Sequence, residues 1–364
     1  MWQSDDQTCT SSIDGPSSPH LSLPSPPLRH HCVATLKGHS SYTSALALAG
    51  DHLFTGSSSG QIHRASLTLP HEATMIASAG EGAVKAIVAS SDDKLITAHQ
   101  DHKIRVWKVH HQQKLTQLAT LPTLSDRAVN LLLPGSHVRV RRHKTSTWVH
   151  HVDAVSALAL SKDESLLYSV SWDRTLKVWR TGDFKCLQSV PNAHDDAINA
   201  VAVNDGAVYT GSSDGRIKVW RRKQGEKSYS LDATLAKHKA GVNALAMSGD
   251  GAVLYSGASD ALVCAWRSEN GGEMAVLRGH AKAVLCLAAV ADHVICSGSA
   301  DQTVRVWRGV GKASYACLAI LEGHRGPIKC ITVHASSDAT SNTWLLYSAA
   351  LDCDIKVWKL CLAI

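Results

Sequence analysis

Short apolar runs separated by polar turns recur along most of this chain. The clearest example lies at residues 279–308, where an apolar run at 283–290 is followed by a second run at 293–298. A polar turn around Asp301 comes next, and then the β-branched run 303–307. Runs of four to eight such residues, bounded by turn residues, are typical of β-strands. The stretch therefore predicts three short consecutive strands joined by tight turns.

Seven units of this kind follow one another, and four side chains mark each complete unit. A His lies at the start, a Ser or Thr on the second strand, an Asp in the next turn and a Trp on the third strand. The Trp follows the Asp by six positions and the Ser or Thr by ten. The five complete sets are His151, Ser169, Asp173 and Trp179; His194, Thr210, Asp214 and Trp220; His238, Ser256, Asp260 and Trp266; His280, Ser297, Asp301 and Trp307; and His324, Ser348, Asp352 and Trp358.

The first two units are incomplete. The first lacks the Asp and the Trp, and the second lacks the His. The residues at the marked positions are His39, Thr55, Ser59 and Ala65 in the first unit, and Gly80, Thr97, Asp101 and Trp107 in the second. We interpret the first unit as a degenerate blade held in place by its neighbours. An adaptable edge that receives a partner is the alternative.

The four marked side chains are suited to a hydrogen-bond chain inside one unit. A buried indole N–H needs an acceptor, and a Ser or Thr hydroxyl supplies it. That hydroxyl donates in turn to the His, whose other ring nitrogen donates to the Asp. A His, an Asp and a Ser also make a hydrolase triad, but five near-identical triads in one chain would have no catalytic purpose. We therefore predict structural tetrads and no catalytic residues.

A repeat of roughly 40–45 residues that begins with Gly-His and ends with Trp is similar to the WD40 repeat. The resemblance covers about residues 32–359. It implies an all-β fold, a seven-bladed WD40 β-propeller, for residues 32–364. The last unit has only three strands of its own, so we expect residues 32–36 to supply its fourth strand and close the ring.

The first 31 residues differ in composition from the rest of the chain. They hold seven Ser and five Pro, and such a segment buries too little apolar surface to offset its ordering entropy. We predict a disordered tail over residues 1–31. Ser18-Pro19 and Ser25-Pro26 fit proline-directed phosphorylation, although a plain solvated tail is the simpler interpretation.

A basic insert over residues 122–148 separates the second and third units. It carries Arg139, Arg141, Arg142 and Lys144, and its VRVRRHK segment alternates as an extra strand does. Insertions between repeats map to loops, often on a binding face. We predict that these four cations bind a partner. A solubilising charged loop is the alternative.

An unusual aromatic residue marks the third unit. The position before the turn Asp is small or polar in most units, but here it is Trp172. Trp and Arg are enriched among the residues that dominate binding energy at interfaces. We therefore add Trp172 to the candidate partner site. The alternative is that the insert covers Trp172, and both interpretations place the insert and Trp172 together.

Composition narrows the function classes. The net charge of +6 and the pI of about 8.8 are mildly basic, so nucleic acid is an unlikely partner. The ten cysteines contain no C-x-x-C pair, which favours reduced, buried thiols over disulfides or metal sites. No signal peptide is evident, and the longest apolar run, at 283–291, is too short to span a bilayer. We expect a protein of the cytoplasm, the nucleus or both, without a membrane segment.

A narrower resemblance lies around the insert. The segments ATLPTLSDR, LPGSHVRVRRHK and SVSWDRTLKVWR are similar to the JINGUBANG-like family of plant WD40 proteins, as is the Lys or Arg that follows each repeat Trp. This resemblance implies a non-catalytic scaffold in plant signalling or gene regulation. The short amino-terminal tail and the incomplete first unit depart from that pattern, and they put functions carried by the tail in doubt.

An interaction scaffold is the leading functional interpretation. We expect a monomer that binds protein partners, among them acidic or phosphorylated segments, and that needs no cofactor and no metal. A substrate receptor of a cullin-type ubiquitin ligase is one alternative, but the Asp-x-Arg that often follows the Trp in such receptors is missing. An RNA-associated propeller is another. A nucleotide-binding Gly loop and a nucleophile elbow are both absent from the sequence.

Overall fold

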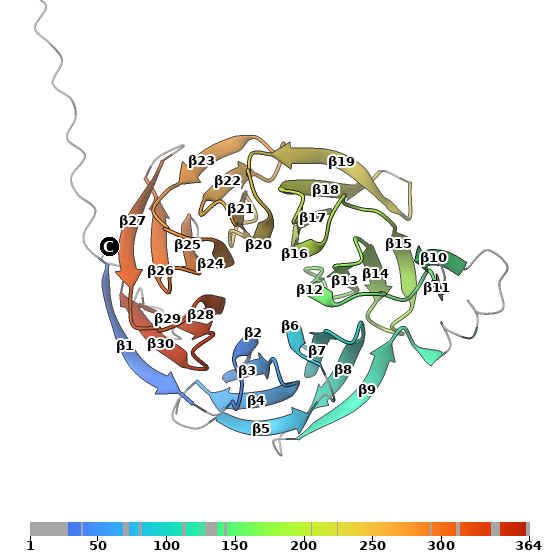
Figure 1. Cartoon of the computed structure of the whole chain (residues 1–364), viewed down its shortest axis with the longest axis horizontal. Coiled ribbons are helices and arrows are strands. Elements are labelled where there is room, and N and C mark those ends of the chain that lie inside the picture. Colours follow the sequence, from blue (N-terminus) through green and yellow to red (C-terminus); the bar gives the residue numbers. More distant parts are fainter. Residues whose placement is uncertain are drawn as a thin grey trace, which may run out of the picture.

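The computed structural model describes residues 28–361, apart from gaps at 38, 68–72, 79, 81, 111–113, 125, 127, 129–136, 142–143, 205, 224, 292, 311–313 and 336–342. The described residues form seven four-stranded antiparallel sheets arranged as blades around one axis, and a separate two-stranded hairpin (Figure 1). The all-β, seven-bladed prediction is confirmed.

Each blade has its first strand nearest the ring axis and its fourth strand at the rim (Figure 1). Blade 1 comprises β2 (Thr43–Ala49), β3 (His52–Ser57), β4 (Gln61–Ser66) and β5 (Ala73–Ser78). Blade 2 comprises β6 (Val84–Ser90), β7 (Lys94–His99), β8 (Ile104–Val109) and β9 (Leu115–Leu121). Blade 3 comprises β12 (Val155–Leu160), β13 (Leu166–Ser171), β14 (Leu176–Arg180) and β15 (Cys186–Val190).

The remaining blades repeat this order. Blade 4 comprises β16 (Ile198–Asn204), β17 (Ala207–Ser212), β18 (Arg216–Arg222) and β19 (Tyr229–Ala236). Blade 5 comprises β20 (Val242–Met247), β21 (Val253–Ala258), β22 (Val263–Arg267) and β23 (Glu273–Leu277). Blade 6 comprises β24 (Val284–Ala291), β25 (Val294–Ser299), β26 (Val304–Gly309) and β27 (Tyr315–Leu321). Blade 7 comprises β28 (Ile328–Ala335), β29 (Thr343–Ala350), β30 (Ile355–Cys361) and β1 (Arg29–Leu36).

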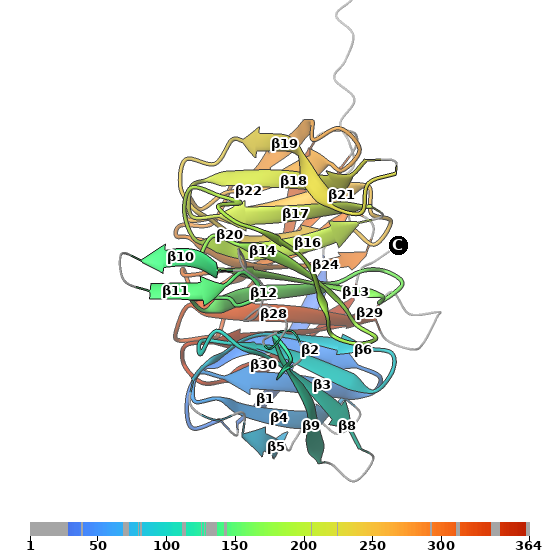
Figure 2. The ribbon, with the colours of Figure 1, turned by 90° about the vertical axis from the view of Figure 1, so that its right-hand side faces the viewer.

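Strand register gives the ring two distinct faces. In blade 3, Val155 pairs with Ser171 at one end of the inner strand, and Leu160 pairs with Leu167 at the other end. The turn between the second and third strands of each blade, which carries the repeat Asp, therefore lies at the end where the inner strand begins. We call this face the Asp-turn face and the other one the opposite face. Figure 2 shows the ring from its side.

Apolar clusters hold neighbouring blades together. Six of the seven clusters join the Trp of one blade to residues of the blade before it, as Trp266 does with Tyr209 and Val219 of blade 4. Among the described residues, the cluster between blades 7 and 1 contains no Trp. The second strand of one blade also approaches the inner strand of the next closely, because a Cβ on Gly257 of β21 would lie only 2.5 Å from Cγ1 of Val284 on β24. Burial of large aromatic and branched side chains is the main stabilising contribution in such a ring.

Hydrogen bonds on the Asp-turn face reinforce these blade borders. In four of the described blades, the side chain of the second inner-strand residue donates a hydrogen bond to the backbone carbonyl of the first inner-strand residue in the next blade. In blade 5, Asn243 Nδ2 lies 2.9 Å from the backbone oxygen of Val284. Ser44, Ser156 and Asn199 make the equivalent bonds to Val84, Ile198 and Val242. Lys85 occupies this position in blade 2. Within the described part of the chain, blade 2 makes no bond of this kind to blade 3.

The ring is closed by β1, which pairs antiparallel with β30 from Arg29–Cys361 to Leu36–Ile355. The expected closing strand at residues 32–36 is thus present, but it begins earlier. Arg29, His30 and His31 belong to β1, and Leu28 is buried in the cluster of blades 6 and 7. The predicted tail boundary at residue 31 is therefore too late. The rest of the predicted tail lies outside the described residues.

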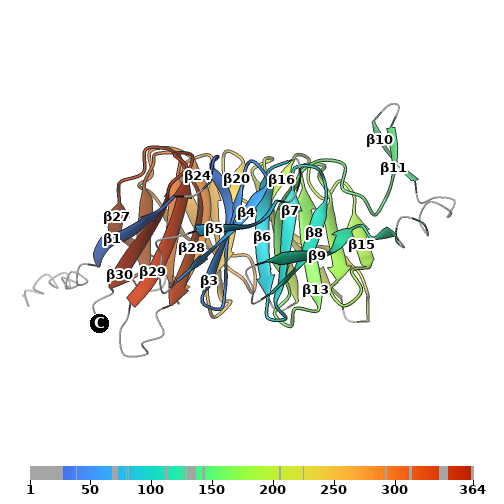
Figure 3. The ribbon, with the colours of Figure 1, turned by 90° about the horizontal axis from the view of Figure 1, so that it is seen from below.

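The insert forms its own small element. β10 (His137–Arg141) and β11 (Lys144–Thr147) pair only with each other. Figures 1 and 3 show this hairpin standing off the rim beyond β15. Nearer the ring, the Asp126 carboxylate is buried and accepts a hydrogen bond of 3.1 Å from the Cys186 backbone N–H on β15. The VRVRRHK segment was expected to form an extra strand, and β10 is that strand, although it pairs with β11 and not with a blade.

Candidate functional site

The complete tetrads each form one hydrogen-bond chain on the Asp-turn face. In blade 6, the Trp307 indole N–H donates to the Ser297 hydroxyl oxygen at 2.8 Å. That hydroxyl lies 2.7 Å from His280 Nε2, and Nδ1 of His280 lies 2.8 Å from Asp301. The Asp301 carboxylate also accepts from the Ala281 backbone N–H. Blades 3, 4, 5 and 7 show the same pattern.

Burial and pairing shift the pKa values of the tetrads in opposite directions. Burial lowers the pKa of His280, although the hydrogen bond to Asp301 counteracts it. Burial alone would raise the pKa of Asp301, but hydrogen bonds from Thr303 and His280 lower it to about 2. The stable arrangement is therefore a neutral imidazole that donates from Nδ1 to a carboxylate and accepts from the hydroxyl at Nε2. The Ser or Thr hydroxyl of each complete tetrad is 0% exposed and already accepts from the Trp indole, so a substrate cannot reach it in this arrangement.

Blade 2 replaces its missing His in a way that the sequence comparison of units overlooked. His99 lies on the same strand as Thr97, and its Nε2 is 2.7 Å from the Thr97 hydroxyl. Arg105 donates two hydrogen bonds to the Asp101 carboxylate, at 3.1 and 2.6 Å. Burial, followed by the charge of Arg105, lowers the pKa of His99 to about 3. His99 thus bonds to Thr97 in place of the missing His, but Asp101 is bound by Arg105 and not by His99, so the chain of a complete tetrad is not formed. The signal in the sequence was a His two residues after the repeat Thr.

Blade 1 lacks the Asp and the Trp and holds two stacked histidines instead. His39 Nε2 lies 2.6 Å from the Thr55 hydroxyl, as in a normal tetrad. His63 stacks on His39 with ring centroids 3.8 Å apart. Nδ1 of His39 and both ring nitrogens of His63 are buried and have no hydrogen-bond partner. Burial, together with the charge of His63, lowers the pKa of His39 to about 4. Blade 1 therefore keeps its four strands, but its buried His side chains make fewer hydrogen bonds than the His of a complete tetrad.

Trp172 lies on the Asp-turn face beside the ring axis. It follows β13, and its backbone N–H donates to the Ala154 carbonyl at 3.1 Å. Its side chain is 40% exposed. The ammonium of Lys85, on the inner strand of blade 2, lies 5.0 Å from the indole ring centroid. A cation over an indole face is attracted by the ring's quadrupole, so this contact bridges the blade border that lacks the side-chain hydrogen bond.

Two more residues on this face were not singled out from the sequence. Leu351 precedes Asp352 in blade 7, as Trp172 precedes Asp173 in blade 3, and it is 44% exposed. Lys329 follows the first residue of β28, the position of Lys85 in β6. Burial, and then repulsion from Lys329, lowers the pKa of Lys85. The signal for Leu351 was an apolar residue where most units carry a small or polar one. The signal for Lys329 was a Lys where blades 1, 3, 4 and 5 carry Ser or Asn.

The cations of the insert are not part of this cluster. The hairpin that carries Arg139, Arg141 and Lys144 stands beyond the rim strand β15, whereas Trp172 contacts an inner strand (Figure 1). The expectation that the insert and Trp172 form one surface is not met, because the chain leaves the ring at the outer strand β9. Arg142, and the side chains of Arg139, Arg141 and Lys144, lie outside the described residues.

Metal and disulfide chemistry have no visible basis in the described part of the chain. It contains no group of three or more His, Cys, Asp or Glu side chains that could hold a metal ion. Its nine cysteines are free thiols, and burial raises the pKa of Cys186, Cys264 and Cys286 to about 12. No helix among the described residues is long and apolar enough to cross a membrane.

Comparison with known families agrees with the blade geometry. The family model described as "WD domain, G-beta repeat" matches residues 71–108, 142–180, 184–221, 229–267, 271–308 and 315–359. The chain belongs to the WD40-repeat family. The six matched segments end at or just after the six repeat Trp residues. The WD40 unit of blade 1, which has neither the Asp nor the Trp, is outside the matched segments.

Several curated proteins share parts of this WD40 chain. Pre-mRNA-processing factor 19 of Oryza sativa subsp. japonica is 33% identical over 21% of this chain and 16% of its own length. Autophagy-related protein 16 of Arabidopsis thaliana is 24% identical over 74% of this chain and 56% of its own length. Protein ROOT INITIATION DEFECTIVE 3 of the same plant is 29% identical over 54% of this chain and 50% of its own length. The chain therefore spans between about a sixth and just over half of these relatives.

Proposed function

We propose that this WD40 protein is a non-catalytic interaction scaffold in plant signalling or transcriptional regulation. We further propose that it binds an acidic or phosphorylated partner segment on the Asp-turn face near blade 3. The observation that carries this proposal is the exposed Trp172 indole with the Lys85 ammonium 5.0 Å from its ring centroid. Rigid aromatic residues beside cations are the side chains that most often dominate binding energy at interfaces.

The chemistry of this cluster favours an anionic segment. Lys85 and Lys329 are close enough for the charge of one to lower the pKa of the other, so an approaching carboxylate or phosphate relieves their repulsion. An apolar side chain of the same segment has Trp172 and Leu351 as exposed surfaces. Charge-assisted hydrogen bonds of this type are about twice as strong as neutral ones. Arg139, Arg141, Arg142 and Lys144 of the insert remain a second proposed contact, separate from the first.

The relatives support the scaffold class but not one pathway. Their names refer to pre-mRNA processing, autophagy and root initiation, and several of these relatives are plant proteins. We propose a monomer that works in the cytoplasm, the nucleus or both. Light scattering of the purified chain tests the monomer, and a fluorescent fusion in plant cells tests the compartment.

The partner site is tested by capture of proteins from plant extract on immobilised protein, with quantitative mass spectrometry. The first variant combines Trp172→Ala with Lys85→Gln, and the second replaces Arg139, Arg141, Arg142 and Lys144 by Gln. Arg267→Gln, an exposed cation outside both proposed sites, is the control. Matched thermal melts establish that each variant is folded.

We expect partners that bind the wild type and the control but are reduced at least tenfold by the first variant. Partners reduced only by the second variant would place binding at the hairpin instead. An identical partner list for all four proteins would overturn both sites. A synthetic segment of each captured partner, with and without its acidic or phosphorylated residues, then tests the charge requirement.

A further inference from the structure

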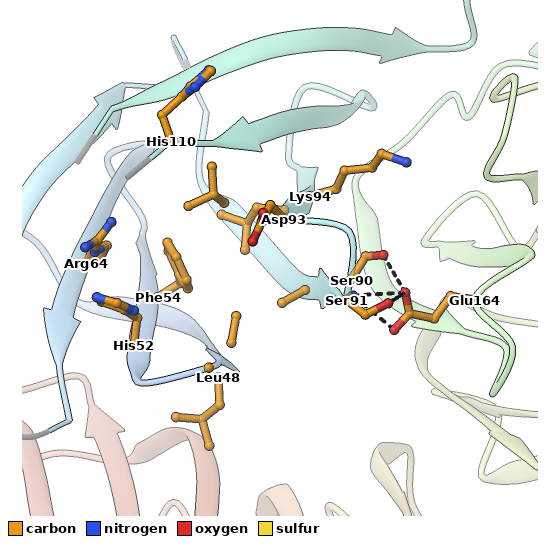
Figure 4. Close-up of a pocket in the computed structure, with 15 residues that line it drawn as sticks. Leu48, His52, Phe54, Arg64, Ser90, Ser91, Asp93, Lys94, His110 and Glu164 are labelled. Carbon is orange, nitrogen blue, oxygen red and sulfur yellow. Dashed lines mark hydrogen bonds between the residues drawn. The ribbon is translucent and has the colours of Figure 1, made fainter. Parts of the chain in front are cut away.

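A cavity of about 490 Å³ lies between blades 1 and 2 and opens on the face opposite to the Asp turns (Figure 4). It is lined by the turn between β2 and β3, the turn between β6 and β7, and the end of β8. Glu164, in the turn between β12 and β13 of blade 3, forms one edge. Cavities of 300–1,000 Å³ are the usual size of binding sites. None of its lining residues belongs to a tetrad or to the Trp172 cluster.

A departure from the repeat lies at this cavity. The residue just before the repeat Trp is buried and apolar in every other blade: Val106, Val178, Val219, Ala265, Val306 and Val357. In blade 1 the residue at this position is Arg64, which is only partly buried. Phe54 also differs from the equivalent Tyr168, Tyr209 and Tyr255, which each use their hydroxyl for a hydrogen bond to the next blade. Blades 2 and 6 carry Ile96 and Cys296 at this position, so they have no such hydroxyl either. Blade 1 lacks that bond and places a cation at the border instead.

Arg64 is the cation of the cavity that is available to a ligand. Within the described part of the chain, no carboxylate lies within ion-pair distance of Arg64, whereas Lys94 pairs with Asp92 at 3.3 Å. Figure 4 shows Arg64, His52 and Phe54 together on the blade 1 wall, with Asp93 on the facing wall. Burial, and then the charge of Arg64, lowers the pKa of His52, so its neutral ring can add a hydrogen bond beside the guanidinium.

The carboxylates around the cavity decide which anion fits. Glu164 is already satisfied, since it accepts from the Ser90 hydroxyl at 2.5 Å and from the Ser91 N–H and hydroxyl at 3.0 and 2.9 Å (Figure 4). It therefore stays charged, and hydrogen bonds from Ser90 and Ser91 keep its pKa low. With Asp93 and Glu164 facing Arg64, a dianionic phosphate meets two negative charges for one free cation. A single carboxylate suits this balance better.

We propose that this cavity binds a peptide segment in which an Asp or Glu lies next to an apolar residue. The carboxylate forms paired hydrogen bonds with the Arg64 guanidinium, whose planar shape matches it. The apolar neighbour packs on Leu48, which lines the cavity and is only partly buried, whereas Phe54 is 2% exposed and contributes little surface. The site is independent of the proposed scaffold site because it lies on the other face, so the protein has two separate docking points.

The test uses a displayed library of random dodecapeptides, selected on the full chain and counter-selected on Arg64→Gln. Each enriched peptide is then synthesised, and its Kd is measured by fluorescence anisotropy. Arg64→Lys keeps the charge but not the paired geometry. Arg222→Gln removes an arginine from a different cavity on the same face and is the matched control. Thermal melts confirm that all variants are folded.

We expect enriched peptides that share an acidic residue beside an apolar one. Their Kd should rise at least tenfold with Arg64→Gln, rise less with Arg64→Lys and stay unchanged with Arg222→Gln. Exchange of the peptide's Glu for Gln should cost the same factor, and exchange for phosphoserine should not restore binding. Selection of no Arg64-dependent peptide, or of peptides that prefer phosphoserine or basic residues, overturns the proposal. Failure of the Trp172 site leaves these results unchanged.

Discussion

In each complete tetrad, one hydroxyl oxygen is hydrogen-bonded to a neighbouring strand and to the segment that precedes the inner strand. Ser297 accepts from the Trp307 indole and bonds to His280, so β25, β26 and the segment before β24 meet at one atom. Trp307 is only 3% exposed. A buried indole N–H without an acceptor loses the full value of its hydrogen bond. The tetrad therefore combines a large apolar contact with a satisfied polar interior.

Replacement of Trp307 by Ala is predicted to lower the free energy of unfolding by about 3–5 kcal/mol, because a large buried aromatic leaves a cavity. Equilibrium urea unfolding measures this change. Trp172→Ala is the control, and as a half-exposed turn residue it should change the free energy by no more than about 0.5 kcal/mol. Equal unfolding midpoints for Trp307→Ala and the wild type would contradict the structural role of the tetrad.

The tetrads, His99 and Arg64 show which parts of the polar interior could be predicted from the sequence. The spacing of Asp and Trp was sufficient to predict the tetrads, since a fixed offset on paired strands gives a fixed geometry. His99 could not be found in this way, because it reaches Thr97 from the same strand and not from the usual loop. Arg64 had a signal in the sequence, because every other unit has Val or Ala at its position. What the sequence could not show is that Arg64 lines a cavity between blades 1 and 2.

At the scale of elements, β1 and the insert behave differently. β1 adds a full strand to blade 7, and Lys356 bonds to Thr35 across the pair. The hairpin of β10 and β11 adds no strand to any blade. Repeat counting predicted the closing strand, because blade 7 was one strand short. It could not predict the position of the insert, since no other unit has an equivalent and its strands pair only with each other.

Removal of β1 is predicted to destabilise the whole ring, whereas removal of residues 1–27 should not. A chain that starts at residue 28 keeps Leu28 and all of β1, so its melting temperature should match that of the full chain. A chain that starts at residue 38 loses the partner of β30 and should melt at least 5 °C lower, with a broader transition. Differential scanning calorimetry makes the comparison. Equal melting of both truncations would show that β1 does not close the ring energetically.

At the scale of the molecule, buried histidines in several blades act together on stability. The pKa of His39 is lowered to about 4 and that of His99 to about 3, mainly by burial. Burial also lowers the pKa values of His151, His194 and His280. An unfolded His titrates near 6.5, so below that pH the unfolded chain binds protons that the folded ring does not accept. Because a buried His with a lowered pKa recurs in several blades, protonation of these residues affects the stability of the whole ring.

The free energy of unfolding is predicted to be steady above pH 7 and to fall as the pH decreases from 6.5 towards 4. A second loss follows between about pH 3.8 and 2, where the pKa of Asp301 lies below its unfolded value. Urea unfolding at pH 7.5, 6.0 and 5.0 measures the first part. The double variant His39→Gln, His99→Gln should show a shallower slope. Stability that rises on acidification would contradict the assignment.

Because β1 pairs with β30, the ring cannot close until translation has reached β30. Thr35 and Lys356 are 321 positions apart, and translation proceeds at roughly 5–20 residues per second. The first strand therefore waits between about 15 s and 65 s for β30, which is its only partner in the sheet, and both of its backbone edges are unpaired in that time. A message cut short before the codons of β30 releases six finished blades in an open ring, and unpaired strand edges of this kind favour aggregation and chaperone capture.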